Sequence, residues 1–223
     1  MAKLKSSLTN MLLSLTLIAL VAAGLLAAVY NVTKDPIDQA KAQKQAAAKI
    51  AVLPALEGIT VSDSAEVVDR LNIFKAYVGE DVVGAAVEAS EIGFGGVFKM
   101  MVGFDKEGTI TGYQILEHQE TPGLGAKMDQ WFKTDKGRQN VIGLNPGKCK
   151  LTVSKDGGDV DAITAATISS RAFLLAVTKA YNAYLSDKLE AVSGATTLHG
   201  DADSSEQSED ENKEENNNET EEN

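Results

Sequence analysis

The first strong pattern in the chain is an uncharged apolar stretch, Met11–Tyr30, which reads MLLSLTLIALVAAGLLAAVY. About 20 residues rising 1.5 Å each match a hydrocarbon layer of about 30 Å, so the stretch predicts a transmembrane helix. A signal peptide is the alternative, because Lys3 and Lys5 precede the stretch. The apolar region exceeds the roughly 7–15 residues of a signal peptide, and no clear small-x-small cleavage site ends it, which favours an uncleaved anchor.

A weaker helical pattern follows the apolar stretch. Asp35 and Pro36 are typical of a helix start, with Asp as the N-cap and Pro at the first helical position. The apolar face that follows is interrupted by Lys44 and stops before Pro54; its members are Ile37, Ala40, Ala47, Ala48 and Ala51. We expect a helical stalk over residues 31–55 that leaves the membrane and docks on a domain.

Between Val67 and Leu116 the pattern changes to short strand-like runs. The candidate strands are Ile73–Val78, Val82–Ala89, Val97–Phe104 and Ile110–Leu116. Asp105–Gly108 predicts a hairpin turn between the last two, and Gly93–Gly96 is a glycine-rich loop before them. Sequential strands joined by turns predict an antiparallel sheet flanked by helices, which makes residues 56–192 an α+β domain.

The segment Asp161–Ser170, DAITAATISS, places four hydroxyl residues among small alanines; they are Thr164, Thr167, Ser169 and Ser170. Apolar residues then recur at helical spacing and predict a helix over Ser169–Ala191; they are Phe173, Val177, Ala180, Tyr181, Tyr184 and Leu185. The start of a helix has unpaired N–H groups and a partial positive charge, which suits a phosphate. A simple N-cap is the plainer interpretation.

A second polar loop, His118–Gly125, reads HQETPGLG. Pro122 and Gly123 set a turn, and Gly125 adds a second freely rotating backbone position, so the loop can present N–H groups to a flat ring. The following residues 126–132 predict a short helix, in which we expect Trp131 to belong to the core.

Charge and composition exclude several classes of site. Residues 201–223 hold eleven acidic residues and one lysine, which is −10 of the total net charge of −11, so the rest of the chain is near neutral and gives no sign of nucleic-acid binding. The acidic segment has no apolar residue beyond Ala202 and predicts a disordered tail. With Cys149 as the only cysteine and His118 and His199 as the only histidines, neither an intramolecular disulfide nor a metal site is expected.

Asp161-x-x-Thr164-x-Ala166-Thr167 resembles the acceptor motif of bacterial flavin transferases, Asp-x-x-(Ser/Thr)-Gly-Ala-Thr, in which the last threonine carries FMN. Ala165 stands where glycine is usual. The segment Glu190–Thr196 has the commoner Ser-Gly-Ala-Thr core, but glutamate replaces the leading aspartate, and we place it after the long helix, beside the acidic tail. Thr167 is therefore the expected acceptor, and a flexible linker is the plainer interpretation of Thr196.

Both motifs, behind a single anchor, are similar to the FMN-binding domain of the RnfG proteins of Rnf electron transport complexes, a domain shared with the sodium-pumping NADH:quinone reductase. The resemblance covers Lys3–Leu189 and implies FMN joined to Thr167 through a phosphoester by a separate flavin transferase. It implies electron relay between redox subunits, on a ferredoxin–NAD path coupled to Na⁺ or H⁺ transport. The implied neighbours of the cofactor are Thr164, Ser169, Ser170, Glu120, Thr121, Leu124 and Gly125. No residue of this chain is expected to be catalytic or to bind a metal.

These predictions divide the chain into a cytoplasmic segment (1–10), a transmembrane helix (11–30), the stalk (31–55), the FMN-binding domain (56–192) and a linker with the acidic tail (193–223). Lys3 and Lys5 favour an inside N-terminus, whereas the four lysines at 34, 41, 44 and 49 argue the other way. The resemblance implies a bacterial inner-membrane protein with the flavin domain on the periplasmic side. Two alternatives stay open: a stand-alone membrane-tethered FMN carrier, and an anchored binding module without a cofactor.

Overall fold

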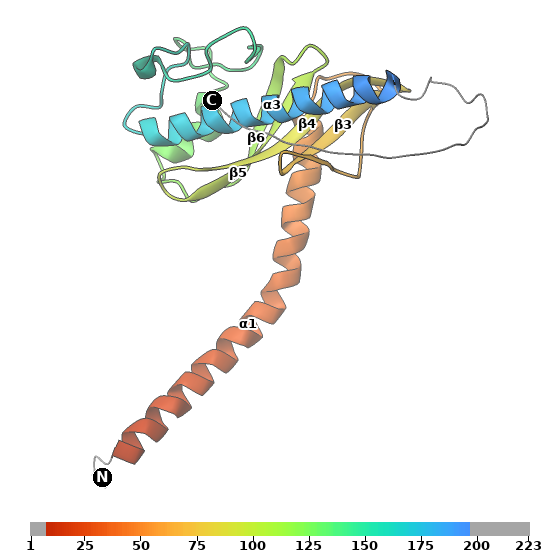
Figure 1. The fold of residues 1–223 in the computed structure, drawn as a ribbon. Coiled ribbons are helices and arrows are strands. Elements are labelled where there is room, and N and C mark those ends of the chain that lie inside the picture. The colour runs from red at the N-terminus through yellow and green to blue at the C-terminus, as the bar shows by residue number, and fades with distance from the viewer. Residues whose placement is uncertain (1–7, 197–223) are drawn as a thin grey trace, which may run out of the picture.

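The computed structural model describes residues 8–196 of the 223-residue chain, and side chains as far as residue 189. A long N-terminal helix carries a folded domain at its upper end, and a second long helix lies across that domain (Figure 1). Most of the predicted N-terminal segment 1–10 and the predicted disordered tail lie outside the described residues.

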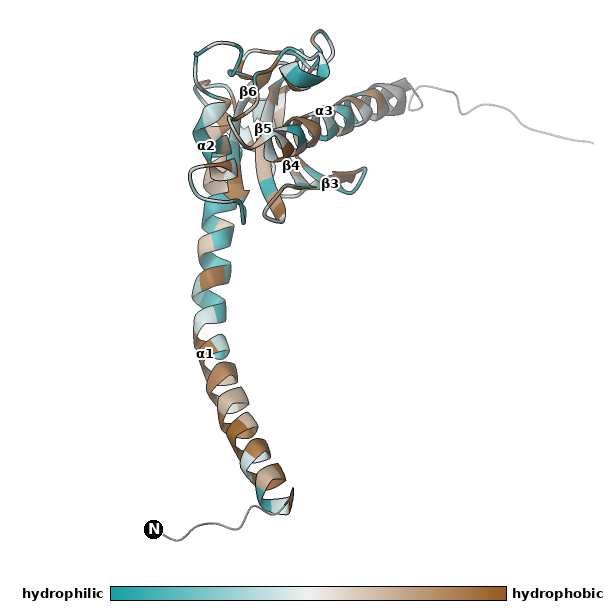
Figure 2. Cartoon of the chain, turned by 90° about the vertical axis from the view of Figure 1, so that its left-hand side faces the viewer, coloured by the Kyte–Doolittle hydropathy of each residue, from teal (hydrophilic) through white to brown (hydrophobic). Residues whose placement is uncertain are grey.

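The helix α1 (Leu8–Ala51) joins the predicted anchor and the predicted stalk into one element. Its lower half is hydrophobic and its upper half is mostly hydrophilic (Figure 2). It is the one described helix that is long and apolar enough to cross a membrane. The prediction that Asp35 and Pro36 start a separate helix is wrong, because Pro36 lies inside α1. A proline inside a helix removes one backbone hydrogen bond and bends the axis, and α1 changes direction along its length in Figure 1.

The domain is built on a six-stranded antiparallel sheet with the order β1-β3-β4-β5-β6, in which β2 also pairs with β3. The strands are β1 (Ile59–Val61), β2 (Glu66–Val68), β3 (Leu71–Val78), β4 (Asp81–Ile92), β5 (Val97–Asp105) and β6 (Ile110–Glu117). The four predicted strands and the antiparallel sheet are confirmed as β3 to β6. Sequence analysis missed β1 and β2, which are three residues long.

The helix α3 (Thr167–Thr196) covers one face of the sheet (Figure 1). Its apolar stripe is buried as the helical spacing predicted; Phe173 and Val177 are fully enclosed in a core that includes Val87 and Met100 of the sheet. The helix starts two residues earlier and ends five residues later than predicted. Burying both partners in one core fixes the start of α3 relative to the sheet.

The upper end of α1 packs on the opposite face of the sheet, where Ala48, Val52 and Leu53 share a smaller core with residues of β3, β4 and β5. A Cβ at Gly103 would lie 2.0 Å from the carbonyl oxygen of Val52, so glycine lets this helix end approach β5. The stalk therefore docks on the domain as predicted. Its predicted apolar face is wrong in detail, because Ala48 is the one predicted member that is buried, and Ile37 is half exposed.

Between β6 and α3 the chain forms only short helices and turns. The predicted helix over 126–132 is replaced by a 3₁₀ turn, η1 (Gly125–Lys127), and one turn of α-helix, α2 (Met128–Trp131). A further 3₁₀ turn, η2 (Ser154–Asp156), lies later in this region. Trp131 packs against the main core, as predicted.

Candidate functional site

A cavity of about 390 Å³ lies at the start of α3, within the roughly 300–1,000 Å³ that small-molecule sites occupy. Three segments far apart in the sequence line it: the loop between β4 and β5, the loop after β6, and the entry of α3. The lining residues are Phe94, Glu120, Thr121, Leu124, Gly125, Ala165, Ala166, Thr167, Ile168 and Ser169.

The backbone of the helix start faces this cavity. The N–H of Ser170 donates to the carbonyl of Ala166 at 3.0 Å and makes the first hydrogen bond of the helix. The N–H groups of Thr167, Ile168 and Ser169 therefore precede the helical hydrogen-bond ladder, and all three residues line the cavity. Unpaired N–H groups and the positive end of the helix dipole make this wall suited to a phosphate.

Ala165, immediately before the helix, has the backbone conformation of a glycine. Its φ is 63°, in the left-handed region that an L-residue with a Cβ rarely adopts. This is the position where the acceptor motif usually has glycine. The departure from the motif is therefore tolerated by the fold, at a cost in backbone strain.

A buried hydroxyl holds the loop before the helix in place. The N–H of Ile163 donates to Ser170 Oγ at 2.9 Å, and Ser170 Oγ donates to the carbonyl of Ala166 at 2.9 Å. Ser170 is fully buried, and its N–H is already used in the helix. Its hydrogen-bonding groups thus serve the loop rather than the cavity.

The leading aspartate of the motif ties this loop to a neighbouring turn. Asp161 Oδ2 accepts from the N–H of Arg138 at 3.0 Å, and the carbonyl of Asp161 accepts from Trp131 Nε1 at 2.9 Å. The backbone N–H of Arg138 is the main cause that holds the pKa of Asp161 below its ordinary value. Asp161 therefore positions the motif from outside the cavity.

Glu120 crosses the cavity wall between the other two segments. Its carboxylate accepts from Ser169 Oγ at 2.8 Å through Oε2 and from the N–H of Gly95 at 3.2 Å through Oε1. Its own N–H donates to His118 Nδ1 at 3.2 Å. The loop after β6, the β4–β5 loop and the start of α3 are thus joined at one side chain.

The rim of the cavity is apolar and exposed. Phe94 is 70% exposed, Ile168 is 53% exposed and Leu124 is 40% exposed, although each is a large hydrophobic residue. Exposed apolar side chains around a cavity mark a surface that a ligand or partner covers. A polar helix start beside an apolar rim fits a molecule with a phosphate at one end and a flat ring at the other, which is the chemistry of FMN.

The structure brings six of the eight predicted site residues to this cavity; they are Thr167, Ser169, Glu120, Thr121, Leu124 and Gly125. It does not bring Thr164, which is exposed, or Ser170 to the lining. Sequence analysis missed Phe94 and Ile168. The available signals were an aromatic residue inside a glycine loop and an apolar residue in the first turn of a helix.

The rival acceptor segment does not lie where we expected it. The prediction that Glu190–Thr196 follows the long helix is wrong, because α3 continues to Thr196. The apolar spacing ends earlier, but Ala191, Ala195 and the neighbouring short side chains do not break a helix already begun. The side chains of residues 190–196 lie outside the described part of the structure.

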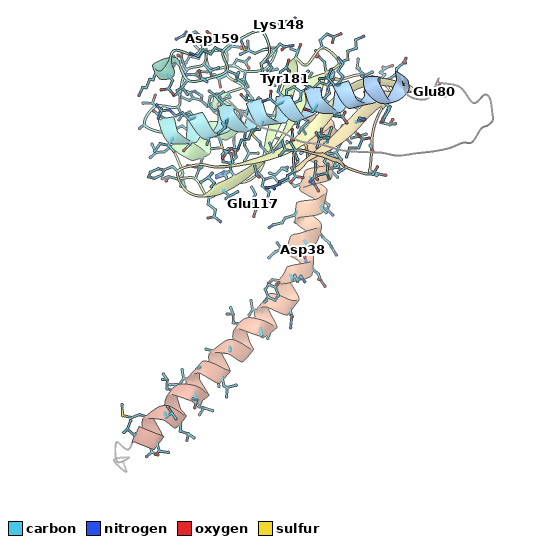
Figure 3. All side chains as sticks on the ribbon, in the orientation of Figure 1. Asp38, Glu80, Glu117, Lys148, Asp159 and Tyr181 are labelled. Carbon is cyan, nitrogen blue, oxygen red and sulfur yellow. The ribbon has the colours of Figure 1, made fainter. Side chains whose placement is uncertain are left out.

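A second cavity, of about 470 Å³, lies between the stalk and the sheet. Its charged groups are paired across the joint: Lys41 lies 3.2 Å from Glu117, which Figure 3 labels beneath the domain, and Gln45 donates to Glu88 at 2.7 Å. These contacts indicate a joint between α1 and the domain. Within residues 8–189, no group of three or more His, Cys, Asp or Glu side chains is arranged to hold a metal ion.

Comparison with known proteins agrees with this geometry. An FMN-binding domain family matches residues 93–182, and the RnfG N-terminal region family matches residues 4–49. The chain is 35% identical over 171 residues to the G subunit of the ion-translocating oxidoreductase complex of Methanosarcina acetivorans, covering 74% of this chain and 88% of the relative. It is also 35% identical over 182 residues to the G subunits of Vibrio vulnificus, covering 74% and 83%, and of Yersinia pestis, covering 75% and 86%.

Proposed function

The chain belongs to the RnfG family, the G subunits of ion-translocating oxidoreductase complexes, and from this premise we propose that it carries FMN covalently on Thr167. It is an FMN-binding flavoprotein of electron transport and a subunit of a multi-subunit redox enzyme rather than a complete enzyme. In the proposal, a separate flavin transferase forms a phosphoester between FMN and Thr167 Oγ. The flavin then relays electrons between other redox subunits, on a ferredoxin–NAD path coupled to Na⁺ or H⁺ transport.

One observation carries the choice of acceptor. Thr167 lies at the helix start, lines the cavity opposite the Glu120–Gly125 loop, and falls inside the segment that matches the FMN-binding domain. Thr196 falls outside that matched segment, which ends at residue 182. The phosphate would take the N–H groups at the start of α3, and the ring would cover the apolar rim, where Phe94 and Leu124 offer a dry surface.

We also propose that the domain lies on the periplasmic, extracytoplasmic side of a bacterial inner membrane. The stalk lysines argue against this by their number, but three of them contact the domain. Lys41 pairs with Glu117, Lys44 donates to the carbonyl of Leu116, and Lys49 lies 3.5 Å above the ring of Phe74. Their positive charge therefore has a structural use, which supports an orientation set by the N-terminal lysines.

The attachment site is tested by peptide mapping. The full chain is expressed with an active flavin transferase, denatured and digested with trypsin, and the flavin-bearing peptide is identified. We expect FMN on the peptide of residues 156–171, and none on residues 189–213, which contain Thr196. Thr167→Ser should keep the flavin, because it keeps the hydroxyl, and Thr167→Ala should lose it, while Thr196→Ala should be unaffected.

Two outcomes would contradict the proposal. Flavin on the peptide of residues 189–213 would move the acceptor to the far end of α3. No covalent flavin at all, with the transferase active on another substrate, would remove the flavin carrier and leave an anchored domain. Copurification with membrane redox subunits then separates a member of a complex from a stand-alone carrier.

A further inference from the structure

The cavity holds a buried acid without a cation. Only two carboxylates among residues 8–189 are buried, Glu120 at 5% exposure and Asp187 at 6%. Asp187 is paired with Lys75 at 3.2 Å. Within the described residues, no Lys, Arg or His nitrogen lies within 4.0 Å of the Glu120 carboxylate. Burying a charge without a partner is costly, so a purely structural role does not explain why this position is acidic.

The surroundings of Glu120 leave room for its carboxylate and nothing more. A Cβ at Gly93 would lie 2.0 Å from Glu120 Oε1, and a Cβ at Gly125 would lie 2.2 Å from Glu120 Oε2. A Cβ at Gly95 would lie 2.9 Å from Glu120 Cα. Glycines on two separate loops therefore accommodate this side chain. A glutamine has the same shape and would fill the same space, so packing alone does not require a charge.

The hydrogen bonds show which groups face the carboxylate. Gly95 contributes an N–H and Ser169 contributes a hydroxyl, and both donate to Glu120. Both carboxylate oxygens accept, which is the pattern of an ionised acid. The cavity thus has a positive end at the helix start and a fixed negative charge beside the Glu120–Gly125 loop.

We propose that the Glu120 carboxylate lowers the reduction potential of the flavin bound in this cavity, and that it also positions Ser169 and the β4–β5 loop around that flavin. The inference rests on the proposed function, since it takes the ring to lie at the Glu120–Gly125 loop. When a reductant gives the ring two electrons, with protons from solvent, no bond to the protein forms or breaks. A fixed negative charge nearby makes this added electron density less favourable, and the effect is large where water is excluded.

The test compares reduction potentials of the full flavin-loaded chain in detergent, titrated spectroelectrochemically with dithionite and mediators. Glu120→Gln removes the charge but keeps an oxygen for the N–H of Gly95 and an NH₂ for Ser169 Oγ. We expect its oxidised-to-reduced equilibrium to shift about tenfold toward reduction, which is about 30 mV for a two-electron couple. Glu117→Gln is the matched control: it also removes one charge, from a half-exposed acid paired with Lys41, and should shift the equilibrium less than threefold.

Threefold is the dividing line. A shift of Glu120→Gln below threefold relative to the control, or toward oxidation, overturns the inference, as does a folded Glu120→Gln chain that no longer accepts flavin. If Glu120→Gln does not fold, Glu120→Asp decides, because it keeps the charge and must stay within threefold of the wild type. Flavin content of the wild type is measured first: its absence refutes the proposed function itself, whereas a loaded wild type with an unshifted Glu120→Gln refutes only this inference.

Discussion

Replacing Ala165 by glycine tests whether the entry of α3 is strained. Ala165 has a φ of 63°, and the only other non-glycine residues with positive φ in the described chain are Asp69 and Arg70, in the turn between β2 and β3. The left-handed conformation costs an L-residue roughly 1–2 kcal/mol, because its Cβ crowds the following carbonyl oxygen. Glycine has no Cβ and avoids this cost.

The expected gain is smaller than the strain itself. Glycine also widens the range of conformations open to the unfolded chain, which offsets roughly 0.4–1 kcal/mol. Ala165 is exposed, so its methyl group contributes little packing. The difference leaves Ala165→Gly more stable by about 0.5–1 kcal/mol, which raises the Tm of a domain of this size by about 1–4 °C.

The chain contains its own probe for this measurement. Trp131 is the only tryptophan, and its Nε1 donates to the carbonyl of Asp161 at 2.9 Å, at the start of the loop that contains Ala165. Urea unfolding of the full chain in detergent, followed by Trp131 fluorescence, therefore reports on the domain. Ala166→Gly is the matched control, because it removes the same group from a residue whose φ is not positive, and it should destabilise by at least about 0.5 kcal/mol.

The comparison has one decisive result. If Ala165→Gly lowers the urea midpoint as Ala166→Gly does, then the left-handed backbone of Ala165 carries no strain and the reasoning is wrong. If only Ala165→Gly raises the midpoint, the acceptor motif uses glycine at this position for its backbone conformation.

Two further predictions concern the same loop. Ser170→Ala should destabilise the domain by about 1–3 kcal/mol, because it leaves the buried N–H of Ile163 without an acceptor, whereas Thr164→Ala, at an exposed position, should stay within about 0.5 kcal/mol; urea midpoints that do not differ would refute the proposed role of the Ser170 hydroxyl. Because the pKa of Asp161 is lowered in the folded chain, its contribution to stability is complete above its ordinary pKa and is lost as the pH falls below about 4. Unfolding free energy measured against pH should therefore fall less steeply there for Asp161→Asn than for the wild type, and equal slopes would contradict the assignment.

Elements with a repeating pattern could be predicted from the sequence. The strands β3 to β6 and the helix α3 appear within a few residues of their predicted bounds, because alternation and helical spacing are local properties. The strands β1 and β2 are too short to show a period. The single helix α1 was predicted as two, because Asp35 and Pro36 give the same signal at a helix start and inside a helix that is already formed. A local signal does not report whether the preceding residues are helical.

The candidate site could be predicted by residue type but not by contact. The acceptor motif and the Glu120–Gly125 loop were identified as separate signals, yet Glu120 and Ser169 lie 49 positions apart and meet at 2.8 Å only because β6 and α3 pack on the same core. The packing also decides which hydroxyls matter: Ser169 faces the cavity, while Ser170, one residue on, faces the loop.

The glycines were the signal that sequence analysis used least. Gly93 and Gly125 were interpreted as flexible positions, whereas the structure shows that each leaves space for the Glu120 carboxylate. Loops that need only freedom of rotation do not need their glycines to converge on one acid. Two loops that lack side chains around an unpaired carboxylate, beside a helix start that favours an anion, imply selection for that charge at that place. A cavity built in this way separates the phosphate of a ligand from the ring, and it acts on the ring by charge rather than by contact area.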